Sequence, residues 1–314
     1  MYQRIRTMTT KELGRRRLAG LLGNLVLTGF VVAVLPGSVV AQAVPSSPPP
    51  GGPPGGGGPT PGQPIAQPPD DQAYALLDQL APPLPANAPK PAADPHNLEG
   101  TWLHDQPLVF RITKDEYGKK LPYSPKGQRI LDKRVKATYQ DGTPYANASA
   151  ACKPPGQQWQ LDLNMPFQIY QRPKEIDFVF EEYHNVWKIR MDQPHRTSGL
   201  REYMGDSVGH WDGSTLVVDT VGYKIPLWLD VDGTPASRNA HLVQRIRKID
   251  YGVPKLEIAT TVDDPEMYTA PWSNVRTFAW RPDMASFNEY NCEHQVGAPG
   301  GVARYGLTPE PPEN

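Results

Sequence analysis

The chain has 314 residues, of which 37 are Pro and 28 are Gly, a fifth of the total against about 12% in an average protein. Residues 44–95 hold 17 of the Pro and 7 of the Gly, so residues 96–314 have the composition of one globular domain. The formal net charge is −1, and the basic residues 1–43 leave −6 for the remainder. This balance argues against nucleic acid or anionic lipid as a partner, because phosphate binding requires concentrated basic charge. The composition also excludes a fibre and a wholly disordered chain.

The first 43 residues have the order of an export signal. Three arginines at 15–17 precede an apolar stretch over 18–34, and Ala41-Gln42-Ala43 has the small-x-small pattern of a cleavage site. The adjacent arginines and the glycines in the apolar stretch fit the twin-arginine route. The alternative is an uncleaved anchor, but a stretch interrupted by an Asn and three Gly spans a hydrocarbon core poorly. We expect a signal peptide over 1–43, a periplasmic or secreted protein, and no integral membrane segment in the mature chain.

Residues 44–95 follow as a predicted disordered linker, because this Pro/Gly-rich segment lacks the apolar side chains that would offset the entropy of ordering. The two cysteines, Cys152 and Cys292, lie 140 positions apart. In an oxidising compartment a lone pair of cysteines favours a disulfide, here between the start and the end of the domain. The alternative is a catalytic thiol, for which only His294 lies near either cysteine in the sequence.

The domain over residues 96–314 is expected to be mainly β. One helix is predicted from Ser124 to Tyr139, with Ser124 as N-cap and Pro125 at the first helical position. Period-two alternation elsewhere predicts strands at 108–113, 176–191, 207–211, 215–223, 241–249, 255–262, 276–280 and 287–292. Strands and helices do not alternate, so an antiparallel barrel or sandwich with one short helix is the expected architecture.

Two hairpins carry candidate chemistry. Asp212-Gly213 is a two-residue turn signal that would pair His210 with Thr215, and it would leave His210 too far from Asp219 for a direct acid–base pair. In the second hairpin, pairing residue 249 with 256 would place His241 opposite Asp264. A carboxylate that faces an imidazole can fix its tautomer for proton transfer, although an ordinary ion pair at the strand end is the alternative.

Aromatic residues indicate a cavity mouth. Trp228, Tyr268 and Trp272 stand in turns beside predicted strand ends, which suits a hydrophobic or aromatic small molecule, while a filled core is the alternative. The candidate ligand-binding residues are His184, Arg190, His210, Trp228 and Trp272.

No cofactor is expected. None of the seven histidines has the spacing of a zinc site, and Asp230-Val231-Asp232-Gly233 is predicted to be a turn because it lacks the later acidic ligand of a calcium loop. A phosphate loop and a dinucleotide fingerprint are missing from the sequence, and Gly205-Asp206-Ser207-Val208-Gly209, which has the Gly-x-Ser-x-Gly pattern, leads into a predicted strand instead of the helix that follows a nucleophile elbow. Metal, nucleotide and serine-hydrolase chemistry are therefore disfavoured.

Several motifs together resemble a widespread family of secreted bacterial proteins. They are Ser207-Val208-Gly209-His210-Trp211-Asp212-Gly213 with the strand after it, His241-Leu242-Val243-Gln244-Arg245, Asp263-Asp264-Pro265 with Pro271-Trp272, Cys152-Lys153-Pro154-Pro155-Gly156, and Glu289-Tyr290-Asn291-Cys292-Glu293. The resemblance covers about residues 97–293 and implies a lipocalin-like β-barrel, to whose entry motif Gly100-x-Trp102 is similar. It implies no activity. Ser214 and Gln244 replace acidic residues that the family usually carries at these positions.

Two principal hypotheses follow. The first is an exported barrel that binds a hydrophobic or aromatic small molecule, with Arg245 or Arg190 orienting a polar end. The second is a cofactor-independent lyase, hydratase or isomerase in the same cavity, with His241 as general acid or base, Asp264 fixing its tautomer, and Arg245 or Tyr268 stabilising negative charge. A structural envelope protein, tethered through its Pro-rich arm, is a third interpretation.

Overall fold

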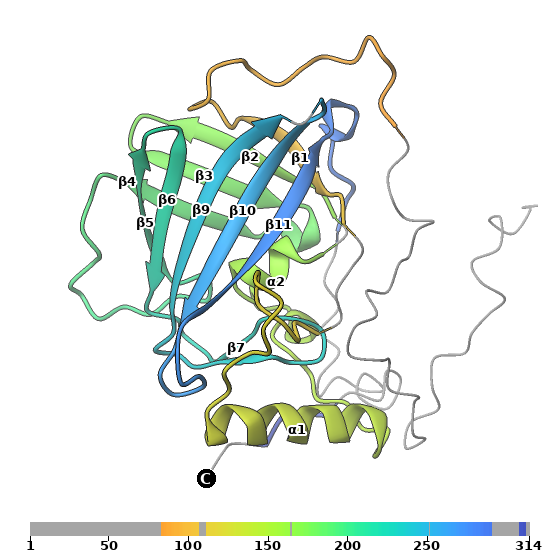
Figure 1. Cartoon of the computed structure of the whole chain (residues 1–314), viewed down its shortest axis with the longest axis vertical. Helices are drawn as coiled ribbons and strands as arrows, with labels where there is room; N and C mark the ends of the chain where they lie inside the picture. Colours follow the sequence, from red (N-terminus) through yellow and green to blue (C-terminus); the bar gives the residue numbers. More distant parts are fainter. Residues whose placement is uncertain (1–82, 107–110, 164, 251, 291–307, 312–314) are drawn as a thin grey trace, which may run out of the picture. The chain divides into compact units, whose positions relative to one another are not determined.

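The computed structural model describes residues 83–106, 111–163, 165–250, 252–290 and 308–311, all of which belong to one compact unit. Its centre is a closed barrel of nine strands in the order β1-β11-β10-β9-β6-β5-β4-β3-β2 (Figure 1). The strands are β1 (Gly100–His104), β2 (Phe167–Arg172), β3 (Glu175–Phe180), β4 (Val186–Met191), β5 (Asp206–Asp212), β6 (Thr215–Val221), β9 (His241–Asp250), β10 (Pro254–Asp263) and β11 (Trp272–Trp280). The mainly β, lipocalin-like barrel predicted from the sequence is confirmed.

One junction of the barrel is parallel. Strand β4 pairs with β5 in the same direction, with Ile189 opposite Ser207, whereas every other neighbouring pair of barrel strands runs antiparallel. A parallel pair requires a long crossover, and here residues 192–205 run from one end of the barrel to the other along its outside (Figure 1). This crossover segment carries charged side chains that pair with residues on the outer face of the barrel.

The helix α1 (Pro125–Tyr139) is confirmed where the sequence predicted it. The Ser124 hydroxyl accepts a hydrogen bond from the Gly127 backbone N–H at 3.0 Å, as an N-cap does. Helix α1 lies outside the barrel, below one end of it (Figure 1), and we call this end the base. The small sheet of β7 (Leu227–Trp228) and β8 (Pro235–Ala236) lies at the same end.

The prediction of one strand over 176–191 is wrong. The segment forms two antiparallel strands, β3 and β4, joined by a 3-10 turn at Glu182–His184. Tyr183 and His184 both have φ of +51° in this turn, a left-handed conformation that non-glycine residues seldom adopt. The apolar side chains on both faces of the segment therefore reflect two short strands rather than a bulge.

Other elements also differ from expectation. Strand β2 and the short helix α2 (Gln157–Leu161) were not predicted, while residues 111–113 and 287–290 form no strand. The remainder of those two predicted strands, and the whole predicted signal peptide, lie outside the described residues. Residues 83–95 of the predicted linker contact the barrel, since the Trp280 indole donates to Pro89 O at 2.7 Å and the Lys248 ammonium donates to Ala92 O and Asp94 O.

Two apolar clusters pack inside the barrel and at its base. The first occupies the barrel interior and includes Trp102, Phe167, Phe178, Trp187 and Phe278, each at most 1% exposed. The second, at the base, packs the α1 side chain Ile130 with residues from the ends of the strands and from the basal loops. Along the part of the chain that the structure describes, no helix has both the length and the apolar character needed to cross a bilayer.

Candidate functional site

The second hairpin has a register one residue away from the predicted one. His241 pairs with Asp263 instead of Asp264, and Arg245 pairs with Ala259. Because side chains alternate between the two faces of a strand, a slip of one residue sends partners to opposite faces. His241 consequently lies on the outer face, whereas Asp264 is buried at the base and accepts hydrogen bonds from Ser237, from its backbone N–H at 2.5 Å and its hydroxyl at 3.0 Å. The predicted pairing of His241 with Asp264 is therefore wrong.

His241 instead faces Asp219, through a Nε2–Oδ2 distance of 2.9 Å. The other oxygen of Asp219 lies 3.0 Å from Nε2 of His195, which belongs to the crossover segment. The sequence prediction missed this arrangement because it placed the turn of the first hairpin at Asp212-Gly213. Its turn is Gly213-Ser214 and its register is shifted by two residues, so that Asp219 pairs with Val208.

His195 also links Asp219 to a second, buried carboxylate. Its Nδ1 lies 3.1 Å from Asp206 Oδ2, so both ring nitrogens face carboxylate oxygens. His195 therefore bridges the two carboxylates, Asp206 and Asp219.

Asp206 is the centre of this group. The guanidinium groups of Arg190 and Arg196 both donate to it, at 3.0 and 2.8 Å, and the Arg196 backbone N–H donates as well. Burial alone would raise its pKa, but these hydrogen bonds and that from His195 lower the pKa of Asp206 to about 2. We call the whole group the outer-face cluster; its members are Arg190, His195, Arg196, Asp206, Asp219 and His241.

The remaining predicted residues are dispersed. Arg245 forms an exposed ion pair with Asp212, His210 is exposed on the outer face, and His184 is exposed in the β3–β4 turn. Tyr268 is buried at the base, where its hydroxyl donates to Pro235 O at 2.7 Å and burial raises its pKa well above the ordinary value. Trp272 is buried beside it, with the two ring centroids 5.4 Å apart.

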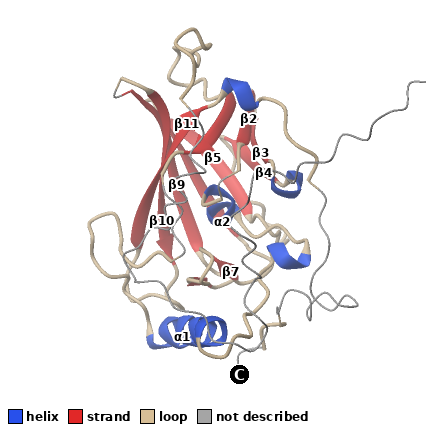
Figure 2. Cartoon of the chain, turned by 90° about the vertical axis from the view of Figure 1, so that its right-hand side faces the viewer, coloured by secondary structure: helices blue, strands red, loops and turns tan. Residues whose placement is uncertain are grey.

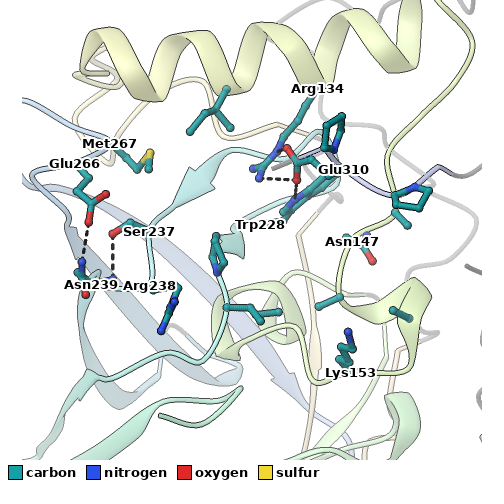
Figure 3. A pocket seen from close by; sticks show the side chains of 18 of the residues that line it. Arg134, Asn147, Lys153, Trp228, Ser237, Arg238, Asn239, Glu266, Met267 and Glu310 are labelled. Atoms are coloured by element: carbon teal, nitrogen blue, oxygen red, sulfur yellow. Dashed lines mark hydrogen bonds and ion pairs between the residues drawn. The ribbon is translucent and has the colours of Figure 1, made fainter. Parts of the chain in front are cut away.

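A pocket of about 920 Å³ lies at the base, between α1, β7 and the segment 146–153, and we call it the basal pocket. Its wall contains the predicted residue Trp228 together with apolar side chains of Ile130, Ile225 and Met267. The Trp228 indole N–H donates to Glu310 at 3.3 Å, and the Arg134 guanidinium stacks over the Trp228 ring at 4.6 Å. These contacts fix the ring at the edge of the pocket (Figure 3).

The charges around the basal pocket are unbalanced. Two of its cations are neutralised, since Arg134 pairs with Glu310 at 2.8 Å and Lys126 pairs with Glu266 at 2.9 Å. The hydrogen bond from Lys126, with help from Asn239, lowers the pKa of Glu266, so this carboxyl is ionised at neutral pH.

The other lining cations are Lys153, Arg201 and Arg238. Arg201 donates to the backbone oxygens of Tyr223 and Arg238 and to Asn239 Oδ1. Among the described residues no carboxylate pairs with any of these three. Lys153 and Arg238 lie on the side of the pocket away from α1 (Figure 3). The pocket therefore combines an apolar wall with excess positive charge.

Sequence reasoning found Trp228 but missed these cations. Arg238 belongs to the irregular segment between β8 and β9, and Lys153 follows a 3-10 helix at Ser149–Ala151, so no periodicity marks either one. Cys152 precedes Lys153, whereas Cys292 lies outside the described residues, and the Cys152–Cys292 disulfide stays a prediction. Comparisons of the chain with protein-family models and with curated proteins gave no match.

Proposed function

We propose that the protein is an exported binding protein whose basal pocket takes a small anionic molecule with an apolar or aromatic body. The observation that carries this proposal is the pair of cations, Lys153 and Arg238, that line the pocket opposite α1 without a carboxylate partner in the described chain. Ligand sites in proteins combine a mainly apolar wall with a few polar groups that fix orientation. Trp228 and Met267 supply the wall, and the two cations supply the orientation.

The charge distribution supports an anion in particular. The chain after residue 43 carries a net charge of −6, yet the pocket lining holds five basic side chains and two carboxylates. A local positive region on an acidic protein concentrates anions and disfavours cations, because field lines focus in a concave site. This refines the expectation of a hydrophobic or aromatic ligand by adding an acidic group to it.

The experiment compares an aromatic anion with a neutral molecule of similar shape. Binding of 8-anilinonaphthalene-1-sulfonate and of N-phenyl-1-naphthylamine is measured by fluorescence for the wild type and for the double variant Lys153→Gln/Arg238→Gln. We expect the double variant to bind the sulfonate at least about tenfold more weakly and the neutral amine about equally, because only the sulfonate has a charge to lose a partner.

Two further variants locate the effect. Trp228→Leu should weaken both probes, since the indole contacts the apolar body that they share. Lys119→Gln, which removes an exposed cation outside the pocket lining, should change neither. Equal sulfonate binding by the wild type and the double variant would overturn the proposal.

A further inference from the structure

A row of polar side chains crosses the inside of the barrel. Thr260 on β10 pairs with Gln244 on β9 and with Asn274 on β11, so the three residues stand side by side. All three are buried, at 0 to 3% exposure, and share the inward face with the core residues Ile246 and Ile258. We call these three residues the amide row.

The amides of this row are unsatisfied. Both polar atoms of the Gln244 amide and both of the Asn274 amide lack a hydrogen-bond partner within the described structure. Buried polar groups in native proteins are nearly always paired, and an unpaired one is costly to keep. Apolar residues of similar shape would fill the same space without this cost, so the two amides point to a role other than packing.

The short helix α2 lies between the barrel strands and the basal elements β7 and α1 (Figure 2), and Asp162, which follows it, pairs with Arg276, two residues from Asn274 on β11. All five of its residues, Gln157–Leu161, are buried, and Leu161 belongs to the apolar cluster of the barrel interior. Three polar links tie the segment to different sides of the barrel: Gln157 donates to the Tyr223 hydroxyl at 2.5 Å, Gln160 donates to Glu182, and Asp162 pairs with Arg276 at 2.6 Å. Helix α2, rather than α1, is therefore the plug of the barrel.

The plug is itself poorly satisfied. The side-chain oxygens of Gln157, Gln158 and Gln160 have no hydrogen-bond partner in the part of the chain that the structure describes, and neither has the Trp159 indole N–H. A helix held mainly by apolar packing would not present three glutamines to a barrel interior. Its buried amide oxygens are therefore further acceptors without a partner, on a segment that Asp162 ties to β11, the strand of Asn274.

The charged groups in this region cancel. Arg276, which stands two residues from Asn274 on the inward face of β11, is neutralised by Asp162. Burial lowers the pKa of the inward-facing His104, whose Nδ1 lies 2.8 Å from Gln106 O, so its ring is uncharged at neutral pH. The buried carboxyl of Glu182 accepts from Ser149 and Gln160, and burial raises its pKa, so unpaired donors and acceptors remain in the interior beside a carboxyl that is disposed toward its neutral form.

We propose that the barrel holds a second binding site, between α2 and the amide row, for a small uncharged molecule rich in hydroxyl groups, such as a sugar or a polyol. A hydroxyl both donates and accepts, so it can satisfy amide oxygens and amide N–H groups alike. Helix α2 acts as the lid of this site, and the ligand enters when its polar links to Tyr223, Glu182 and Arg276 open.

The first part of the test asks whether the amides are unpaired in the free protein. Thermal unfolding is compared for the wild type, Gln244→Met and Asn274→Leu. Each variant should raise Tm by about 2–4 °C, because it replaces an unpaired amide by an apolar group of similar shape. The matched control is Gln168→Met on β2, whose amide donates to Ala285 O at 2.5 Å and whose loss should lower Tm. A lower Tm in both amide-row variants would show that their amides are partnered.

The second part tests binding with four neutral compounds: glycerol, D-ribose, D-glucose and maltose. Gluconate, measured at the same ionic strength, is the charged comparison. At least one neutral compound should raise the Tm of the wild type by about 2–4 °C, since a ligand that binds only the folded state stabilises it. The rise should persist in Arg238→Gln, vanish in Asn274→Leu, and be missing with gluconate. The proposal fails when no neutral compound raises Tm, or when Asn274→Leu responds as the wild type does.

Discussion

The outer face and the interior of this barrel each carry a polar group, and the two differ in how completely they are paired. In the outer-face cluster, Asp206 accepts from two arginines and lies within hydrogen-bond distance of His195, and Asp219 lies between His195 and His241, although Nε2 of His241 makes no hydrogen bond within the described structure. In the amide row, Gln244 and Asn274 have no partner among the described residues. Pairing indicates a structural role for the first group, and its lack indicates a ligand role for the second.

This difference reverses the expectation from sequence. The sequence favours charged residues and histidines as site residues because their side chains can carry chemistry. In the structure the charged residues and His195 of the outer-face cluster hold the crossover segment 192–205 against the barrel. Unpaired buried atoms include the neutral amides on strands β9 and β11, and two exposed cations in irregular loops have no carboxylate partner among the described residues. Unpaired polar groups, rather than histidines and ion pairs, therefore define the two binding sites that we propose.

The largest effect should come from removing the centre of the outer-face cluster. Asp206→Asn leaves Arg190, Arg196 and His195 facing one another without their shared carboxylate. We expect a loss of about 2–3 kcal/mol in unfolding free energy, because breaking a largely buried ion network leaves the remaining charges without a partner. Urea denaturation measures it, with Asp212→Asn as control, whose exposed pair with Arg245 should contribute nothing measurable. Equal stability of Asp206→Asn and wild type would contradict the structural role.

The pH dependence of stability should separate two buried carboxyls. The pKa of Asp206 is lowered to about 2, so its contribution is present above about pH 4 and is lost as pH falls toward 2. Burial raises the pKa of Asp230 at the base to about 6 despite its hydrogen bonds with Thr234, so its contribution is present below about pH 4 and is lost as pH rises through 6. Urea titrations from pH 2 to 7 should lose the acid-side change in Asp206→Asn and the change near pH 6 in Asp230→Asn. Profiles parallel to the wild type would exclude these assignments.

The smallest effect is expected at His241. His241→Gln should reduce stability by less than about 1 kcal/mol, because the imidazole is partly exposed and Asp219 keeps its contact with His195. It should leave the binding of both naphthalene probes and of the neutral sugars unchanged, as measured by fluorescence and thermal unfolding. A loss of binding in His241→Gln would show that the outer-face cluster takes part in ligand binding and would contradict its purely structural role.

Part of the candidate site could be predicted from sequence. Trp228 was identified because aromatic residues in turns beside strand ends often stand at a cavity mouth, and it does line the basal pocket. Lys153 and Arg238 could not be found this way, since segments of the chain far apart in sequence build the pocket around them. The amide row could not be predicted for a similar reason. Its glutamine and asparagine lie on separate strands, and only the sheet register places them on either side of Thr260.

The sequence by itself determined the local elements. A serine followed by proline began the helix at Pro125, and period-two alternation fixed β5, β6, β9 and β10 to within a residue or two, because capping and side-chain alternation are local properties. The choice between partners was decided by the tertiary structure. A slip of one residue between β9 and β10 separated His241 from Asp264, and the parallel pairing of β4 with β5 brought His195 to Asp219. Register and crossover depend on how the whole barrel closes around its core, and that closure is a property of all nine strands together.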